Sequence, residues 1–236
     1  MIDHYLPRPV YALTPFTMLD YPQKTACIIW FAKCNMRCAY CHNPDIVDGQ
    51  GKMGENDILG FLIRRQGLLD GVVISGGEAT FYKNLPFLLR QIKKMGFSIK
   101  LDSNGTYPEV IKELFENQLI DYLALDYKAS PCKFQKVTGV GRRMWDKFQE
   151  TLDYLCANQQ DKFEVRTTIH TELLKETDIN SIIADLETKN YKGVYYLQNY
   201  QHKEDGTLGD MIEQVKKFNP DLIQEVSGFE IEYRNF

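Results

Sequence analysis

Residues 25–44 read TACIIWFAKCNMRCAYCHNP, an apolar stretch that runs directly into three cysteines. Thr25–Phe31 is apolar nearly throughout, which is typical of a strand that is buried on both faces. Cys34, Cys38 and Cys41 follow at the spacing C-x3-C-x2-C, so they fall on the loop after this strand. The stretch therefore predicts a buried parallel strand whose carboxyl end carries a thiol-rich loop.

Outside this stretch, the chain alternates short apolar runs with longer helical patterns. The other candidate strands are Gly71–Ser75, Ser98–Asp102, Tyr122–Asp126, Glu164–Ile169 and Gly193–Gln198. The candidate helices lie near residues 55–66, 84–95, 108–117, 145–157, 176–189 and 208–218. Apolar strands that are separated by single helices indicate parallel pairing with right-handed crossovers. Six such units favour an α/β fold, a partial TIM-like (β/α)6 barrel of parallel strands, over a doubly wound sheet, which periodicity alone leaves open.

The absence of an obvious linker predicts one domain over residues 1–236, with a core of about 13–200 and a C-terminal extension of about 201–236. The closing stretch VSGFEIEY indicates one further strand. The formal net charge of −4 argues against a nucleic-acid partner or an anionic membrane surface. The N-terminus lacks the features of a signal peptide and no apolar run could span a bilayer, so we expect a cytoplasmic protein without a membrane partner.

Three closely spaced thiolates leave a four-coordinate metal site one ligand short. Zinc would need a fourth ligand such as His42, but His42 directly follows Cys41, and adjacent residues rarely both reach one tetrahedral ion. A thioredoxin-like dithiol would leave Cys34 unexplained. An iron–sulfur cluster accepts closely spaced cysteines, and three ligands leave one iron of a four-iron cluster open. We favour the iron–sulfur cluster, with zinc and a purely redox site as alternatives.

Other polar signatures also follow predicted strands: SGGE at 75–78, DSNG at 102–105, DYK at 126–128 and the stretch 198–202. In barrels of parallel strands, active sites are built at this carboxyl edge. The signatures therefore predict one site that is assembled from many loops. Tyr40 lies between the last two cysteines, and we expect it to be exposed rather than part of the core.

With these motifs together, the sequence resembles the radical S-adenosylmethionine (SAM) superfamily, whose signature is C-x3-C-x-aromatic-C. The stretch LTPFTMLDYPQKTACIIWFAKCNMRCAYCHNPD at 13–45 is similar to the activating enzymes of glycyl-radical enzymes, especially those that act on anaerobic ribonucleotide reductase. The resemblance covers at least Leu13 to about Gln198. It implies a radical SAM oxidoreductase whose cofactors are a [4Fe–4S] cluster and S-adenosylmethionine.

The resemblance also implies a role for each matching residue. Cys34, Cys38 and Cys41 are the implied cluster ligands, and S-adenosylmethionine occupies the open iron. The residues placed against this cofactor are Tyr40, His42, Gly76, Gly77, Glu78, Asp102, Ser103, Asp126, Lys128, Arg166, Gln198 and His202. Among them, Gly76 and Gly77 let the backbone approach the methionyl amino group, and Lys128 pairs with the carboxylate.

Two positions in this set carry open questions. An arginine that points inward from a strand needs a buried carboxylate, and Asp126 is the candidate partner of Arg166. Gln198 and His202 are equal candidates for one cofactor contact, because the sequence around His202 departs from the usual proline-tyrosine-histidine context.

The implied reaction is the one-electron cleavage of S-adenosylmethionine, followed by removal of a glycine hydrogen from a partner glycyl-radical enzyme. We expect this partner to be anaerobic ribonucleotide reductase. We also expect an external electron donor such as flavodoxin, because no reductant-binding motif is apparent.

Two alternatives stay open. One is a small-molecule radical SAM enzyme similar to 7-carboxy-7-deazaguanine synthase, although LDYP at 19–22 and YCHN at 40–43 favour an activase. The other is a non-catalytic iron–sulfur carrier or zinc-binding module, which would leave the shared edge of SGGE, DSNG and DYK as a coincidence.

Overall fold

The structure, a computed structural model, describes residues 8–202 and 206–236. The chain divides into two compact units. Unit 1 contains the described residues up to Asn35, together with Asp45–Ser103 and Glu113–Leu123, and unit 2 contains Met36–Pro44, Asn104–Lys112 and Ala124–Phe236. The single domain expected from the sequence stays a prediction.

The strands of unit 1 follow one another across the sheet in chain order. They are β1 (Val10–Thr17), β2 (Ala26–Phe31), β3 (Gly71–Gly76) and β4 (Ser98–Ser103). β2, β3 and β4 are parallel, as predicted, and their central residues Ile29, Ile74 and Leu101 are fully buried. β1 was not predicted. It is antiparallel to β2 and half-exposed along most of its length, so it lacks the continuous apolar pattern of a buried strand.

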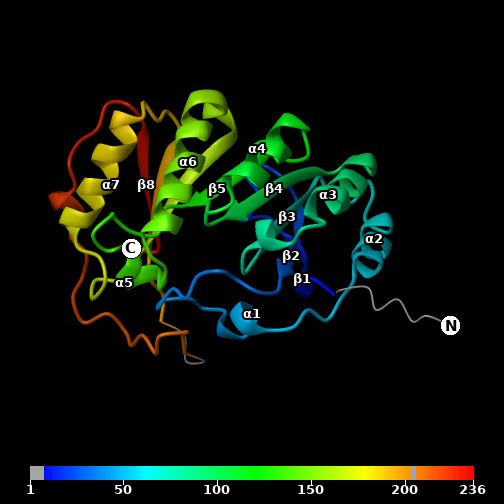
Figure 1. Cartoon of the computed structure of the whole chain (residues 1–236), viewed down its shortest axis with the longest axis horizontal. Coiled ribbons are helices and arrows are strands. Elements are labelled where there is room, and N and C mark those ends of the chain that lie inside the picture. Colours follow the sequence, from blue (N-terminus) through cyan, green and yellow to red (C-terminus); the bar gives the residue numbers. More distant parts are fainter. Residues whose placement is uncertain (1–7, 203–205) are drawn as a thin grey trace. The chain divides into compact units, whose positions relative to one another are not determined.

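The helices of unit 1 cover the sheet with one apolar side each. They are α2 (Glu55–Ile63) and α3 (Leu85–Lys94), which lie side by side in Figure 1. α3 buries leucine or isoleucine at positions 85, 88, 89 and 92, the spacing of an amphipathic helix. Asn84 precedes α3, but its side-chain amide donates to Glu55 Oε1 at 2.6 Å instead of capping the helix.

Unit 2 continues the βα pattern, and β5 (Tyr122–Asp126) carries the boundary between the units. The strands that follow it in order are β6 (Phe163–Ile169), β7 (Val194–Asn199) and β8 (Glu230–Arg234). β6, β7 and β8 are parallel, and β8 confirms the strand predicted in VSGFEIEY.

The long helices of unit 2 were predicted within a few residues. They are α6 (Arg142–Asn158) and α7 (Glu176–Thr188), drawn next to each other in Figure 1. Gln149 on α6 donates to Asp185 on α7 at 3.0 Å, and Asp185 also accepts from the hydroxyl of Tyr127 at 2.8 Å. α4 (Pro108–Glu116), which crosses the unit boundary, begins at Pro108, the first residue of the predicted range 108–117.

The structure also has two short helices that were not predicted. They are α1 (Pro44–Asp48) and α5 (Phe134–Thr138), each five residues long and therefore too short to show a helical period. No helix in the described part of the chain is both long and apolar enough to cross a membrane.

The helix predicted near 208–218 is wrong, because the described residues from 206 to 219 form no helix. Gly206 and Gly209 weaken a helix at this point, and Asp210 adopts a left-handed backbone with φ of 49°. The amides of Leu208 and Gly209 donate to carbonyl oxygens of the cysteine-containing loop instead of to a helix. Hydrogen bonds to the cysteine-containing loop therefore take the place of the hydrogen bonds that a helix would form.

Candidate functional site

In unit 1, the SGGE motif at the end of β3 lies against the backbone of the loop that carries Cys34. A Cβ atom on Gly77 would lie 1.9 Å from the carbonyl oxygen of Lys33, and one on Gly76 would lie 2.3 Å from the amide nitrogen of Phe31. The Glu78 amide donates to the same Lys33 oxygen at 2.9 Å. The resemblance assigned these glycines to a ligand, and the structure shows that Gly76 also lets β3 approach the end of β2 while Gly77 lets its loop approach Lys33.

Replacing Gly77 with Ala is therefore expected to destabilise the protein by about 3 kcal/mol, because the new methyl group meets backbone that cannot yield easily. Urea unfolding of the metal-free protein measures this change. The matched control is Gly60→Ala in α2, where a Cβ would meet nothing within 4 Å and should stabilise the helix by about 0.5–1 kcal/mol. Equal unfolding midpoints for Gly77→Ala and the wild type would contradict the contact.

Glu78 links the loop that follows β3 to the carboxyl end of β4. Its carboxyl group is buried, and Oε1 accepts hydrogen bonds from the amide and hydroxyl of Thr80 at 3.2 and 2.5 Å and from the hydroxyl of Ser103 at 3.0 Å. A buried carboxylate needs such donors. Glu78 therefore fixes the position of Ser103, another predicted site residue.

Asp102 in β4 is held by a neighbouring cation and hydroxyl. Its Oδ2 accepts from the Ser75 hydroxyl at 3.1 Å, and its Oδ1 lies 3.2 Å from Lys100 Nζ. Lys100 is buried on the same face of β4 as Asp102, since every second residue of a strand points to the same face. Sequence reasoning missed Lys100, although a lysine within the apolar strand pattern SIKLD was a visible signal.

The LDYP motif lies at the opposite, amino ends of these strands. Tyr21 is buried and packs with Ala26 and Val73, and a Cβ on Gly71 would lie 2.9 Å from its ring. The carbonyl oxygen of Asp20 accepts from Lys100 Nζ at 2.7 Å. The motif that favoured an activase over its alternative is thus a packing element and contributes no side chain to the carboxyl edge of β2–β4.

In unit 2, residues 36–42 form what we call the cysteine loop. The Cys41 amide donates to the Cys38 carbonyl oxygen at 2.9 Å, so these two cysteines share one tight turn. The loop is attached to the end of α5, because the amides of Arg37 and Ala39 donate to carbonyl oxygens of that helix at 2.7 and 3.2 Å.

The expectation that Tyr40 is exposed is wrong, since only 5% of it is accessible to solvent. Its ring faces Lys128, whose Nζ lies 6.0 Å from the ring centroid. The Tyr40 hydroxyl is buried and has no hydrogen-bond partner among the described residues. Burial raises the pKa of this hydroxyl above its ordinary value, so it stays a neutral O–H donor.

Asp126, at the end of β5, is shared by two cations. Lys128 Nζ lies 2.9 Å from its Oδ2, and Arg166 Nε donates to its Oδ1 at 3.2 Å, which confirms the predicted pairing with Arg166. Burial raises the pKa of the Asp126 carboxyl, but the two cations outweigh it and hold this pKa below its usual value. Burial lowers the pKa of Lys128, and Asp126 outweighs that effect, so its pKa lies well above the ordinary one.

Three rings stack at the ends of β6 and β7. The His42 ring lies 5.0 Å from the Tyr200 ring, and His170 packs edge-on against Tyr200 at 4.7 Å. Tyr200 is buried, and sequence reasoning missed it although it directly follows β7. Gln198 is half-buried within β7, whereas His202 is exposed.

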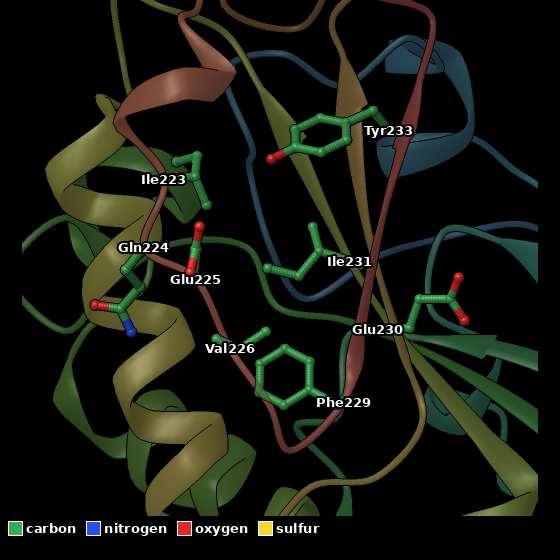
Figure 2. Close-up of a pocket in the computed structure, with 8 residues that line it drawn as sticks. All are labelled: Ile223, Gln224, Glu225, Val226, Phe229, Glu230, Ile231 and Tyr233. Atoms are coloured by element: carbon green, nitrogen blue, oxygen red, sulfur yellow. The ribbon is translucent and has the colours of Figure 1, made fainter.

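A separate groove of about 460 Å³ lies in unit 2 beside β8 (Figure 2). Its wall is mixed, with the apolar side chains of Ile223, Val226, Phe229 and Ile231 beside the polar ones of Gln224, Glu225 and Glu230. No predicted site residue lines it. The groove therefore offers neither thiols nor the charged groups described above, and we assign it no role in the site.

Residues 28–185 match the family model of the radical SAM superfamily. The chain belongs to this superfamily. Over 207 residues, this radical SAM protein is 35% identical to a Methanocaldococcus jannaschii protein whose provisional name is glycyl-radical enzyme activating enzyme; the match covers 83% of this chain and 81% of that protein. The pyruvate formate-lyase-activating enzyme of Clostridium pasteurianum is 29% identical over 137 residues, which are 53% of this chain and 56% of that enzyme.

The fold comparison agrees. The structure of Streptococcus suis SuiB bound to S-adenosylmethionine has a TM-score of 0.66 and 15% identity, over 88% of this chain and 52% of that one. This similarity confirms the predicted α/β, partial-barrel fold. As a radical SAM enzyme, the protein uses a [4Fe–4S] cluster and S-adenosylmethionine as cofactors.

The residues of unit 2 fit these cofactors. Cys38 and Cys41 supply two thiols from one turn, and thiolates are the ligands that iron–sulfur clusters prefer. The partnerless Tyr40 hydroxyl offers a buried donor in the same loop. Cys34 belongs to unit 1, and among the described residues no group of three or more Cys, His, Asp or Glu side chains lies close enough to hold a metal ion.

Proposed function

We propose that this radical SAM enzyme activates a glycyl-radical enzyme, and that the partner is anaerobic ribonucleotide reductase. The observation that carries the proposal is the similarity to the M. jannaschii protein, which is named for such an activity and is matched over most of both chains. The C. pasteurianum relative is named for the activation of a different enzyme. The choice of ribonucleotide reductase therefore rests on the sequence of residues 13–45, and flavodoxin is the proposed electron donor.

In this proposal, Cys34, Cys38 and Cys41 are the cluster ligands. When bound, the cluster and S-adenosylmethionine supply a one-electron cleavage that yields a radical able to remove a glycine hydrogen. The chain's contribution is to hold these groups in place and to exclude water. Tyr40 and His42, on either side of Cys41, are the proposed contacts of the adenosine.

The charges of unit 2 suit the carboxylate of the cofactor's methionyl group. Lys128 and Arg166 both pair with the carboxylate of Asp126, at 2.9 and 3.2 Å. Since both cations are largely buried, an incoming carboxylate would gain charge-assisted hydrogen bonds there. Lys128 thus keeps the role that the resemblance gave it, with Asp126 as the group that positions it.

The remaining proposed contacts come from strand ends. In unit 1, the backbone of Gly76 and Gly77 and the side chains of Glu78, Asp102 and Ser103 are proposed to serve the methionyl end. The hydrogen bonds from Ser103 to Glu78 and from Ser75 to Asp102 would keep these side chains preorganised. In unit 2, Gln198 is the better candidate for the remaining contact, because it belongs to β7 and is half-buried while His202 is exposed.

Electron paramagnetic resonance tests this function directly. Anaerobically reconstituted protein, reductant, S-adenosylmethionine and anaerobic ribonucleotide reductase should together give the doublet of a glycyl radical. The control is the same partner with its radical-bearing glycine replaced by Ala, which should give no doublet. A doublet only with pyruvate formate-lyase would overturn the choice of partner. Cofactor cleavage without a radical on any glycyl-radical enzyme would overturn the activase function and favour a small-molecule substrate.

A further inference from the structure

The segment Gly206–Gln214, which we call the strap, makes direct backbone contacts with the cysteine loop. The Leu208 amide donates to the carbonyl oxygen of Cys41 at 3.1 Å, and the Gly209 amide donates to that of Ala39 at 2.9 Å. A Cβ on Gly209 would lie 2.8 Å from both Cα and Cβ of Ala39. Only a glycine therefore lets the two backbones approach this closely. In Figure 1 the orange trace of the strap passes the blue trace of the loop.

The other half of the strap is anchored at the carboxyl ends of β6 and β7. The Tyr200 hydroxyl donates to the carbonyl oxygen of Met211 at 3.3 Å, and His170 Nε2 lies 3.0 Å from that of Ile212. The side chain of Gln214 accepts from the Thr171 amide at 2.9 Å and donates to the carbonyl oxygen of Tyr200 at 3.0 Å. His170 and Tyr200 directly follow these two strands, and Tyr200 packs against the ring of His42 in the cysteine loop.

The cysteine loop is consequently held from two sides. The end of α5 accepts hydrogen bonds from the amides of Arg37 and Ala39, and the strap donates to the carbonyl oxygens of Ala39 and Cys41. The strap contributes little to the core, because Ile212 is 66% exposed and Thr207 is the one buried residue between 206 and 214. Its contacts orient the loop more than they stabilise the fold.

We propose that the strap positions the cysteine loop for cluster binding, and that Gly209 is its central positioning residue. The inference rests on the proposed assignment of Cys38 and Cys41 as ligands. Without the strap, the carbonyl groups of Ala39 and Cys41 lose their donors and the turn that carries both thiols is free to change shape. Misoriented ligands hold a metal group less tightly.

The test compares Gly209→Ala with Gly141→Ala, both in the full-length protein. A Cβ at Gly141, the N-cap residue of α6, would meet nothing within 4 Å, and neither glycine has a left-handed backbone, so only Gly209→Ala forces a contact with Ala39. After anaerobic reconstitution, iron release to a chelator should be about tenfold or more faster in Gly209→Ala. The EPR spectrum of its reduced cluster, and the change in this spectrum on adding S-adenosylmethionine, should also differ from those of Gly141→Ala.

Thermal unfolding of the metal-free variants separates positioning from general stability. We expect the two midpoints to agree within about 3 °C. Gln214→Ala loosens the strap without touching the loop, and it should also accelerate iron release. This variant provides the test if Gly209→Ala does not fold. Iron release at the wild-type rate in both strap variants would overturn the inference. A loss of stability in the metal-free strap variants that is large enough to account for their faster iron release would also overturn the inference.

The failure of the other proposals would look different. A wild-type protein that takes up no iron would remove the ligand assignment and the strap inference together. A loaded wild type that gives no glycyl radical, while Gly209→Ala still loses iron faster, would reject the activase function and leave the strap inference standing.

Discussion

Replacing Cys38 with Ala is expected to reduce the cluster content of the reconstituted protein, and with it the cleavage of S-adenosylmethionine, to background. A four-iron cluster that is held by three thiolates keeps one iron open for the cofactor, and removal of one thiolate leaves too few ligands. Cys38 shares a turn with Cys41, closed by a backbone hydrogen bond at 2.9 Å, so no other thiol can take its place easily. Iron and sulfide per chain and released 5′-deoxyadenosine are the measurements.

Cys132→Ala is the matched control, because Cys132 is an exposed cysteine of the same unit and has no proposed role in the cluster. It should keep the full cluster and the full rate of cleavage. A Cys38→Ala protein with an intact, active cluster would contradict the ligand assignment. Stoichiometric zinc without iron in the wild type would instead support the zinc alternative.

Replacing Asp126 with Asn is expected to destabilise the metal-free protein by about 3 kcal/mol, the second large effect. The variant keeps Lys128 and Arg166, whose side chains are only 19% and 14% exposed, but removes the carboxylate that neutralises them. Two largely buried cations that lose this shared carboxylate repel each other and have lost their hydration. Urea unfolding at neutral pH measures the loss.

The pH dependence gives this prediction a second readout. The pKa of the folded Asp126 carboxyl lies below the ordinary value of 3.8, so its contribution to stability is present above that value. The contribution disappears as the pH falls through the lower, folded pKa. The difference between wild type and Asp126→Asn should therefore be constant from about pH 6 to about pH 8 and shrink only in strong acid.

Glu150→Gln is a matched control, since Glu150 pairs with Lys112 at 2.6 Å on the surface. Solvent screens such a pair, so the unfolding midpoint should hardly change. If Asp126→Asn were no more harmful than Glu150→Gln, the two cations would not depend on Asp126 and the account of this cluster would fail.

β2, β3 and β5 were predictable because each carries an apolar run that ends in a polar signature. β5 has the predicted bounds, and the predicted helices of 84–95 and 176–189 occur as α3 and α7. The pairing of Arg166 with Asp126 was predictable for a chemical reason, since a strand arginine that points inward needs a carboxylate. The local hydrophobic pattern was sufficient to predict these strands and helices, and charge balance was sufficient to predict the Arg166–Asp126 pair.

Other features depend on contacts between distant residues, which no local pattern shows. Gly77 is needed because Lys33 lies against it, and Gly209 because Ala39 does. The apolar residues of 208–218 suggested a helix, but the amides that would begin it are bonded to the cysteine loop. Tyr40 is buried for a similar reason, since its loop is enclosed by segments that are far away in the sequence.

The transfer of an isotope tests the central claim most directly. Anaerobic ribonucleotide reductase labelled with α-deuterated glycine is incubated with the reconstituted enzyme, S-adenosylmethionine and reductant, and the 5′-deoxyadenosine is analysed by mass spectrometry. If the enzyme removes a hydrogen from a glycine of its partner, the product carries deuterium, and replacing that glycine with Ala abolishes the label. Product that forms at the same rate without deuterium would show that the hydrogen comes from elsewhere and would contradict the activase function.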